Sequence, residues 1–281
     1  MQNNSCPGIT LSLAGRTALI TGGSRGIGAA TVRLFHQAGA RVAFSYQSAA
    51  APAHALAAEC GGPDHCRAIQ QTLASPEDGH ALVAAAIAAF GRLDILIVNH
   101  GVWPAHEAPI ATMSPTQWRT TLAINLDSVF GLVQSAVAQM QSQQPQSSPP
   151  ARSGASVPPP ALPRGHIVLV ASTAAQRGEA FHADYAASKG ALISLTKSLS
   201  SELASSGIYC NCVAPGWVAT TMSAAALSHP ETSKQVMAAI PLGRPAHVDE
   251  IAGPILFLCT PLAGFISGEI FNVNGGAVLV G

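Results

Sequence analysis

Short apolar runs alternate with longer amphipathic segments along most of the chain. The runs typical of buried strands lie at 17–21, 41–46, 66–71, 94–99, 166–172, 208–214 and 269–274. Helix-length segments lie between them, near 26–38, 49–60, 77–90, 115–140, 184–206 and 247–259. The strand runs are rich in Val, Ile and Leu without polar alternation, as a parallel sheet covered on both faces requires. The alternation therefore predicts one α/β domain over residues 1–281, with a doubly wound seven-stranded parallel sheet and helices on both faces.

One segment, 141–164, breaks this alternation. It holds seven of the 20 prolines of the chain and only two charged residues. Proline lacks the amide hydrogen that a helix interior or a central strand needs, and this segment has little apolar surface to bury. We interpret 141–164 as a flexible surface insertion between a long helix and the fifth strand, rather than as a PxxP element that binds a partner.

Composition narrows the class of protein. Of the 281 residues, 48% are hydrophobic and only 10% are charged, and the formal net charge is zero. Such an apolar chain indicates a large core or surfaces buried between subunits, and zero net charge gives no sign of nucleic-acid binding. No run approaches 18 consecutive strongly apolar residues, so we expect no membrane span.

The amino terminus and the cysteines bear on location. Residues 1–5 contain neither the basic nor the apolar stretch of a signal peptide. The six cysteines form no C-x-x-C pair, and His65 beside Cys66 has no second spaced pair to complete a metal site. We therefore expect reduced thiols, no bound metal and a cytoplasmic location.

A glycine-rich turn, LITGGSRGIGAAT, follows the first predicted strand and opens the first predicted helix. Its glycines are Gly22, Gly26 and Gly28, spaced G-x-x-x-G-x-G rather than G-x-G-x-x-G. Glycine lets the chain turn tightly and lets a pyrophosphate approach the backbone, while the amino terminus of the helix offers free N–H groups. Between a strand and a helix, this turn predicts a Rossmann-type dinucleotide-binding domain.

The end of the second predicted strand bears on the choice of dinucleotide. It reads SYQS at 45–48, and the first acidic residue of the chain is Glu59. Sites for NAD usually place an acid near this strand end to bind the ribose hydroxyls, and an acid there would repel a 2′-phosphate. Arg25 in the glycine turn is placed to pair with that phosphate, and Ser45 and Ser48 are placed to donate hydrogen bonds. We expect NADP(H), with NAD(H) as the alternative.

Tyr185 and Lys189 lie four residues apart in a predicted alanine-rich helix and therefore share a face. A free tyrosine has a pKa of about 10. A neighbouring ammonium and a nicotinamide cation would favour the phenolate and lower the pKa of Tyr185 toward the range that suits proton transfer. The alternative interpretation makes both side chains solvated surface groups.

With the glycine turn and the Tyr185–Lys189 pair, the sequence resembles the short-chain dehydrogenase/reductase family, in particular its 3-oxoacyl-[acyl-carrier-protein] reductase-like branch. The residues 21–28 resemble the family's TGxxxGIG turn, and IVNHG at 97–101 resembles its NNAG element. Ser172 lies 13 residues before Tyr185, and Tyr185 and Lys189 form the family's Y-x-x-x-K pair. The stretches NCVAPGWVATTM, PLGRPAHVDEIAGPILFL and FISGEIFNVNGG also match the family's pattern, so the resemblance covers nearly the whole chain.

The resemblance implies a catalytic tetrad of Asn125, Ser172, Tyr185 and Lys189. Tyr185 would give its proton to a carbonyl oxygen while a hydride from nicotinamide attacks the carbon, and Ser172 would orient that oxygen. Lys189 would hold the nicotinamide ribose, and Asn125 would anchor a water that relays protons. The cofactor-binding residues that the resemblance and the turn together predict are Gly22, Ser24, Arg25, Gly26, Ile27, Gly28, Ser45, Tyr46, Asn99, Gly101, Tyr185, Lys189, Pro215, Gly216, Val218 and Thr220.

Three residues depart from the family's pattern. Thr72 occupies the place of an acid that often faces the adenine, and Asn274 replaces an aspartate in the last motif. His100 replaces a small residue beside the cofactor, and we interpret it as packed or bonded to the backbone rather than as a tuning group.

The implied function is NADPH-dependent reduction of a 3-oxoacyl thioester ketone to a secondary alcohol, as in fatty acid biosynthesis. The alternatives are a reductase of another small secondary alcohol, a sugar or a polycyclic ketone, and a non-catalytic NADP-binding sensor. Acyl carrier protein is a candidate partner, but Gly131 and Ser206 stand where carrier-protein reductases have basic residues. We expect specificity to come from 102–109 and 222–240, whose small or apolar residues indicate a moderately apolar substrate.

The resemblance also implies a homotetramer. The predicted helices 115–140 and 184–206 would pair across one interface and the last strand across another. The apolar composition agrees with such interfaces. The insertion leaves the first of these helices, and we expect it to extend away from the interface.

Overall fold

The computed structural model describes residues 11–145 and 162–280. The predicted flexibility of the insertion, for residues 146–161, and the interpretation of residues 1–5 fall outside the described residues. The seven predicted strands are all present, and they form one parallel sheet in the order β3-β2-β1-β4-β5-β6-β7. Their bounds are β1 Thr17–Ile20, β2 Arg41–Tyr46, β3 Cys66–Gln70, β4 Ile95–Val98, β5 Gly165–Val170, β6 Ile208–Pro215 and β7 Ile270–Val273.

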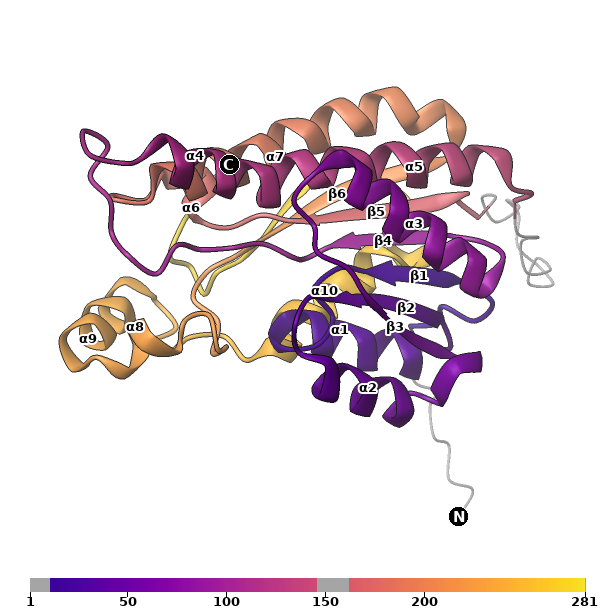
Figure 1. Ribbon diagram of the computed structural model, residues 1–281, viewed down its shortest axis with the longest axis horizontal. Helices are drawn as coiled ribbons and strands as arrows, with labels where there is room; N and C mark the ends of the chain where they lie inside the picture. Colours follow the sequence, from indigo (N-terminus) through magenta and orange to yellow (C-terminus); the bar gives the residue numbers. More distant parts are fainter. Residues whose placement is uncertain (1–10, 146–161, 281) are drawn as a thin grey trace, which may run out of the picture.

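Helices cover both faces of the sheet, as the sequence predicts (Figure 1). One face carries α3 (Pro76–Phe90), α5 (Ser128–Ser142) and α7 (Ala183–Leu203). The other face carries α1 (Gly26–Gln37), α2 (Ala50–Glu59) and α10 (Val248–Leu258). The remaining helical elements are α4 Pro115–Leu122, the π-helical turn η2 Ala123–Asp127, α6 Ala174–Arg177, α8 Ala224–Ser228, α9 Pro230–Ala239 and the 3₁₀ turns η1 Gly62–Asp64, η3 Ala204–Ser206 and η4 Pro261–Ala263. The chain is thus a single doubly wound α/β domain.

The apolar side chains of the strands contribute to two hydrophobic cores, one on each face of the sheet. Ala18 and Ile20 of β1 belong to the core under α1, α2 and α10, whereas Leu19 between them belongs to the core under α3, α5 and α7. Successive side chains of a strand point to opposite faces, so a strand buried on both sides must be apolar at every position. This explains why β1, β4 and β5 are buried throughout and lack polar alternation.

Within residues 11–145 and 162–280, one helical run is long and apolar enough, by length and composition, to cross a membrane. The residues Pro115–Ser142, which form α4, η2 and α5, contain an 18-residue window with a mean hydropathy of 1.3. In the fold, 44% of this window is buried inside the protein, and α5 packs against α3 and the sheet. A core helix of a soluble protein meets the same criterion, so the run is weak evidence for a span.

The two ends of the 146–161 segment are anchored at the amino-terminal edge of the sheet. Arg16 donates to the Pro163 carbonyl at 3.0 Å and lies 3.6 Å from the buried carboxylate of Asp94. On the other side of the segment, Gln143 donates to the Leu93 carbonyl at 2.7 Å. The insertion therefore leaves and re-enters the fold at the edge opposite the carboxyl ends of the strands.

Two glycines allow α3 and α5 to cross closely. A Cβ atom at Gly131 of α5 would lie 2.7 Å from the Cα atom of Pro76, and one at Gly79 of α3 would lie 2.5 Å from the Leu132 nitrogen. Gly131 therefore cannot carry a basic side chain without separating the two helices. The second position of interest, Ser206, accepts a hydrogen bond from Gln141 at 3.1 Å. Neither position offers a cation to a carrier protein.

We predict that Gly131→Ala lowers the free energy of unfolding by about 1–3 kcal/mol, because the added methyl group has no room at the helix crossing. Gly253→Ala in α10 is the matched control, because a Cβ atom there meets nothing within 4 Å. The free energy of unfolding of this control is expected to rise by about 0.5–1 kcal/mol, because alanine has a better helix propensity than glycine. Urea unfolding of both variants measures the difference, and equal stabilities would contradict the close crossing.

Candidate active site

A cleft of about 460 Å³ lies at the carboxyl-terminal edge of the sheet. Most of the residues predicted from the sequence line it together: Gly22, Ser24, Arg25, Gly26, Ile27, Ser45, Tyr46, Asn99, Gly101, Ser172, Tyr185, Lys189, Pro215, Gly216, Val218 and Thr220. Thr72 and His100 line it as well. Two predicted residues, Gly28 and Asn125, lie behind its wall and do not line it. Residues from distant parts of the sequence thus converge because parallel strands end at the same edge.

The glycine turn forms one end of this cleft. Gly22 and Gly26 have φ angles of +66° and +55°, a region of backbone conformation that side chains rarely allow. A Cβ atom at Gly28 would lie 2.7 Å from the side-chain nitrogen of Asn99. Gly28 therefore serves close packing of the first helical turn against Gly22 and Asn99, and its predicted contact with the cofactor stays a prediction.

The amino terminus of α1 is open to an anion. Arg25 is the N-cap residue, its side chain makes no capping hydrogen bond, and the first turn holds no acid. Gly26 and Ile27 of this turn line the cleft. The free N–H groups and the positive end of the helix dipole therefore fit a pyrophosphate group.

At the end of β2, the Ser45 side chain binds the glycine turn. The buried Ser45 accepts a hydrogen bond from the Gly22 nitrogen through its Oγ atom at 3.0 Å, and its carbonyl accepts one from Gly23 at 2.8 Å. The Tyr46 hydroxyl lies 3.4 Å from Nε2 of His54. Ser45 thus holds the glycine turn in place and keeps only its O–H to donate to a ligand.

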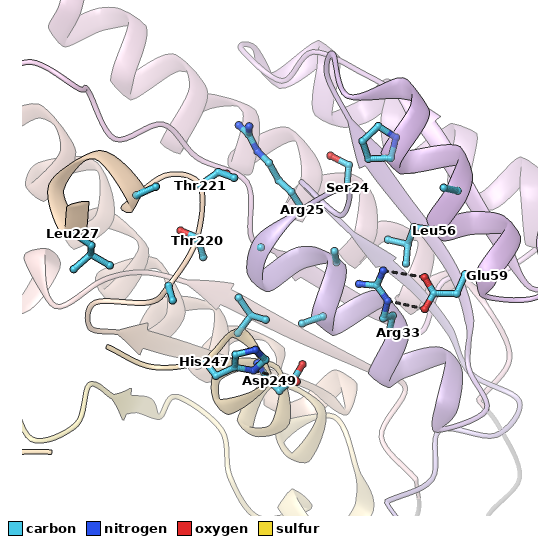
Figure 2. Close-up of a pocket in the computed structure, with 18 residues that line it drawn as sticks. Ser24, Arg25, Arg33, Leu56, Glu59, Thr220, Thr221, Leu227, His247 and Asp249 are labelled. Carbon is cyan, nitrogen blue, oxygen red and sulfur yellow. Dashed lines mark hydrogen bonds and ion pairs between the residues drawn. The ribbon is translucent and has the colours of Figure 1, made fainter. Parts of the chain in front are cut away.

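Arg25 is the cation of the glycine turn that remains available to a ligand. It lines both the cleft and a neighbouring groove of about 930 Å³ between α1, α2 and the segment before α8. Figure 2 shows Arg25 extending away from Arg33, which is paired with Glu59 at 2.7 Å at the other end of the groove. Among the described residues Arg25 has no acidic partner, so its charge is free to pair with a phosphate.

His100 connects the glycine turn to the helix that carries Asn125. Its Nδ1 atom lies 2.8 Å from the Thr21 hydroxyl, and its Nε2 atom lies 3.1 Å from the Ile124 carbonyl. A carbonyl only accepts, so Nε2 carries the proton and Nδ1 accepts from Thr21. Burial and the charge of Lys189 lower the pKa of His100 to about 3. The interpretation of His100 as a packed, backbone-bonded residue is confirmed.

Asn125 lies in the π-helical turn η2, between α4 and α5. Its side-chain oxygen accepts from the Val102 nitrogen at 2.8 Å, and its nitrogen donates to the Val102 carbonyl and to the Ser188 hydroxyl, both at 3.0 Å. The side-chain amide is therefore occupied in fixing the loop after β4 against α7. Its predicted role in anchoring a water stays a prediction.

Ser172, Tyr185 and Lys189 meet in the cleft. Ser172 follows β5, whereas Tyr185 and Lys189 lie one turn apart on α7. The Ser172 hydroxyl acts on the Tyr185 phenol in the direction that lowers the pKa of Tyr185. The Lys189 ammonium donates to the Val170 carbonyl at 2.9 Å, and a Cβ atom at Gly101 would lie 3.2 Å from it. These contacts rule out the interpretation of Tyr185 and Lys189 as solvated surface groups.

Burial dominates the electrostatics of this group. It raises the pKa of Tyr185 to about 12, with Ser172 opposing the rise and the charge of Glu179 adding to it. Burial also lowers the pKa of Lys189 to about 8. The expectation of a lowered pKa for Tyr185 is therefore wrong for the chain by itself, because burial disfavours the charged phenolate. At neutral pH Tyr185 holds its proton, as a general acid must.

The sequence missed part of the cleft wall. The predicted specificity segments contribute Val102, Trp103 and Met222 to the lining, but Trp217 and Glu179 also line it. Most of 222–240 forms α8 and α9, which lie beyond the carboxyl ends of the strands (Figure 1). The sequence did offer one signal for Glu179, because this carboxylate lies only six residues before Tyr185.

We predict that the low pKa of His100 makes the protein sensitive to acid. A histidine in the unfolded chain titrates near 6.5, but His100 in the fold titrates near 3, and His166 behaves in the same way. Between these values the unfolded state binds more protons, so the free energy of unfolding falls as the pH drops from 6.5 toward 3. His100→Gln should flatten this dependence by about 1.4 kcal/mol per pH unit.

Urea unfolding over a series of acidic pH values measures this slope. His247→Gln, at a side chain that is 67% exposed, is the control for the substitution itself. A slope that is unchanged in His100→Gln would contradict the assignment of a buried neutral imidazole.

Two family models match the chain in sequence. One is described as short chain dehydrogenase and matches residues 16–148. The other is described as Enoyl-(Acyl carrier protein) reductase and matches residues 151–278. Together they span most of the chain, and the segment around the insertion lies at their boundary.

Relatives of this chain include enzymes with different substrates. A 3-oxoacyl-[acyl-carrier-protein] reductase from Synechocystis sp. is 32% identical over 272 residues, which cover 95% of this chain and 99% of the relative. An L-rhamnose 1-dehydrogenase (NAD(P)(+)) from Azotobacter vinelandii is 34% identical over 270 residues, covering 94% and 97%.

Solved structures similar to this chain also include proteins described as dehydrogenases. A short-chain dehydrogenase/reductase from Brucella melitensis, described as a glucose/ribitol dehydrogenase, superposes with a TM-score of 0.83 at 33% identity and covers 97% of this chain and 100% of its own. A putative gluconate 5-dehydrogenase from Beutenbergia cavernae with bound NADP has a TM-score of 0.81 at 33% identity, covering 96% and 99%. With the glycine turn, the tyrosine–lysine pair and the seven-stranded sheet in place, this chain belongs to the short-chain dehydrogenase/reductase family and is an oxidoreductase that acts on CH–OH groups.

Proposed function

We propose that this protein is an NADP(H)-dependent reductase that converts a ketone into a secondary alcohol, with Tyr185 as the general acid. The observation that carries the proposal is that Ser172, Tyr185 and Lys189 share one cleft with the glycine turn. A proton donor and a dinucleotide site in the same cleft are what hydride transfer to a carbonyl group needs.

The residues of the cleft fit a nicotinamide dinucleotide. The uncapped first turn of α1 suits the pyrophosphate, and the loop after β6 supplies Val218 and Thr220 opposite the glycine turn, where a Cβ atom at Gly26 would lie 3.3 Å from Thr220. The cofactor, when bound, supplies the hydride. Asn99 and Gly101 at the end of β4, and Pro215 and Gly216 at the end of β6, complete the proposed binding set.

A preference for NADP(H) over NAD(H) has support from the charges of the cleft. Arg25 has no acidic partner among the described residues, and the end of β2 carries no carboxylate. The acid that lines the cleft is Glu179, which belongs to the loop before α7 rather than to the glycine turn. A 2′-phosphate would therefore meet a cation without meeting a carboxylate.

The proposed proton path starts at the Tyr185 phenol, which is protonated at neutral pH because burial raises its pKa to about 12. The Ser172 hydroxyl, which lines the same cleft as this phenol, would bind the same carbonyl oxygen and orient it. The pKa of Lys189 is lowered to about 8, so this residue exchanges protons readily near neutral pH and suits the return of a proton to Tyr185.

Two classes of substrate compete for this site. A 3-oxoacyl thioester, the expectation from the sequence, is supported by the name of the Synechocystis relative, and the rhamnose dehydrogenase supports a sugar instead. Acyl carrier protein as a partner has less support, because Gly131 is buried against α3 and Ser206 is uncharged. A non-catalytic sensor is the least favoured alternative, because Ser172, Tyr185 and Lys189 are all in place.

We also propose a homotetramer in a cytoplasmic setting. Several large apolar side chains stay exposed on the single chain, including Phe130 on α5, and Leu262, Phe265 and Leu279 near β7. These lie on the helix and at the end of the chain where the two interfaces are expected. All the cysteines of the described residues are free and buried, which suits a reducing compartment.

We predict that Tyr185→Phe lowers kcat about 10²–10⁴-fold, because the phenylalanine ring fills the same space but has no proton to give. The measurement follows NADPH absorbance at about 340 nm with acetoacetyl thioester and with a panel of small ketones. Binding of NADPH, measured by fluorescence titration, is the control and should persist in the variant. Turnover that survives in Tyr185→Phe would contradict the mechanism, and NADPH binding without turnover of any ketone by the unaltered protein would favour a sensor.

We predict that Arg25→Ala raises KM for NADPH about tenfold or more and leaves KM for NADH little changed. The reason is that a charge-assisted hydrogen bond to the 2′-phosphate contributes roughly 1.5–3 kcal/mol. Arg33→Ala is the matched control, because Arg33 is already paired with Glu59. An equal effect of Arg25→Ala on both cofactors would overturn the proposed NADP preference.

A further inference from the structure

The mouth of the cleft has an aromatic wall built from three separate loops. Trp103 follows β4, His182 precedes α7 and Trp217 follows β6. The Trp103 and His182 rings are stacked with centroids 4.7 Å apart, and Trp217 meets Trp103 edge to face at 6.4 Å. Trp103 and Trp217 both line the cleft. A substrate bound beside Tyr185 would therefore contact the aromatic rings of Trp103 and Trp217.

Glu179 is fixed within this wall. Its Oε1 atom accepts a hydrogen bond from the Trp103 indole nitrogen at 3.1 Å and lies 3.9 Å from Nδ1 of His182. Its side chain is only 22% exposed, and it lines the cleft. No other protein donor reaches its Oε2 atom among the described residues. An ionised carboxylate only accepts hydrogen bonds, so this oxygen is available for a donor on the substrate.

The loop that carries Glu179 is held rigidly against the loop after β4. The Phe181 carbonyl accepts from the Ala108 nitrogen at 2.9 Å, and Nε2 of His182 lies 3.1 Å from the Pro104 carbonyl. Phe181 has a φ angle of +65°, the one positive value among the described residues other than glycine. A bulky residue in this region is strained, and such strain persists where surrounding contacts demand it, often at functional sites.

The charge of Glu179 affects the reacting phenol of Tyr185. Its charge acts directly on the Tyr185 phenol, which lies in the same cleft. Tyr185 and Glu179 therefore face the same bound substrate. The same cleft is lined by the cations Arg25, Arg177 and Lys189, so a positively charged substrate is disfavoured.

We propose that Glu179 determines specificity by accepting a hydrogen bond from a hydroxyl group near the reacting carbon, so that the natural substrate is a small hydroxylated compound, a sugar or polyol, rather than an acyl thioester. The C–H face of such a compound packs against the electron-rich faces of Trp103 and Trp217. An acyl chain brings no donor to Glu179, so its Oε2 atom would be partly desolvated without a hydrogen-bond donor. Specificity of this kind is strong, because a site built to bond a hydroxyl rejects analogues that lack it.

This inference rests on the proposed reductase function and is tested separately from it. The assay measures kcat/KM with NADP⁺ for L-rhamnose, sorbitol and D-gluconate, and for cyclohexanol as a secondary alcohol without further hydroxyls; acetoacetyl thioester is assayed with NADPH. The unaltered protein is expected to prefer at least one hydroxylated substrate over cyclohexanol by tenfold or more.

Glu179→Gln and Glu179→Ala are expected to reduce that preference at least tenfold, by raising KM for the hydroxylated substrate. The glutamine variant keeps an acceptor for Trp103, so it separates recognition from folding. Glu202→Gln, at an exposed acid on α7 outside the cleft lining and outside the predicted specificity segments, is the matched control and should keep the preference.

Each outcome has one meaning. A loss that is equal for all substrates would indicate a merely structural Glu179 and would overturn the inference. Faster turnover of the thioester than of every hydroxylated substrate would also overturn it, while leaving the reductase function intact. Absence of turnover with every substrate, including the thioester, would instead contradict the proposed function.

Discussion

Parallel pairing of the seven strands is the constraint on which the rest of this structure depends. It brings the carboxyl end of every strand to one edge, so that the loops after β1, β4, β5 and β6 meet there. Gly22, His100, Ser172 and Trp217 come from these four loops, and all line a single cleft. The proline-rich insertion departs from the opposite edge, next to Asp94, and so lies away from the walls of the cleft.

Within that edge, a short chain of hydrogen bonds sets the relative positions of the parts. The Thr21 hydroxyl accepts from the nitrogens of Asn99 and His100 and donates to the His100 ring, whose other nitrogen holds the Ile124 carbonyl. The chain thereby ties the glycine turn to the π-helical turn that carries Asn125. A neutral histidine donates from one ring nitrogen and accepts at the other, so His100 can hold both partners at once.

Desolvation explains the chemistry of the site better than pairwise attraction does. Burial moves the pKa of Tyr185 up to about 12 and that of Lys189 down to about 8, so both shifts favour the neutral forms. A protonated phenol suits carbonyl reduction, and the reverse reaction needs an added positive charge to release that proton. Glu179 acts in the same direction as burial on Tyr185, which links the residue proposed to select the substrate with the residue proposed to protonate it.

The sequence by itself determined the fold, the glycine turn and the Tyr185–Lys189 pair, because strand burial, glycine spacing and an i, i+4 pair are local properties of the chain. Ser172 was added to this pair only through the resemblance to the family. The sequence also placed Trp103 in a specificity loop. It could not reveal that Gly28 and Asn125 lie behind the cleft, that Gly131 has no room for a side chain, or that Glu179 joins Trp103 and Trp217. Those facts depend on contacts between residues far apart in sequence. The direction of the Tyr185 pKa shift was also decided only by the tertiary structure, because the loss of hydration depends on everything that packs around the phenol.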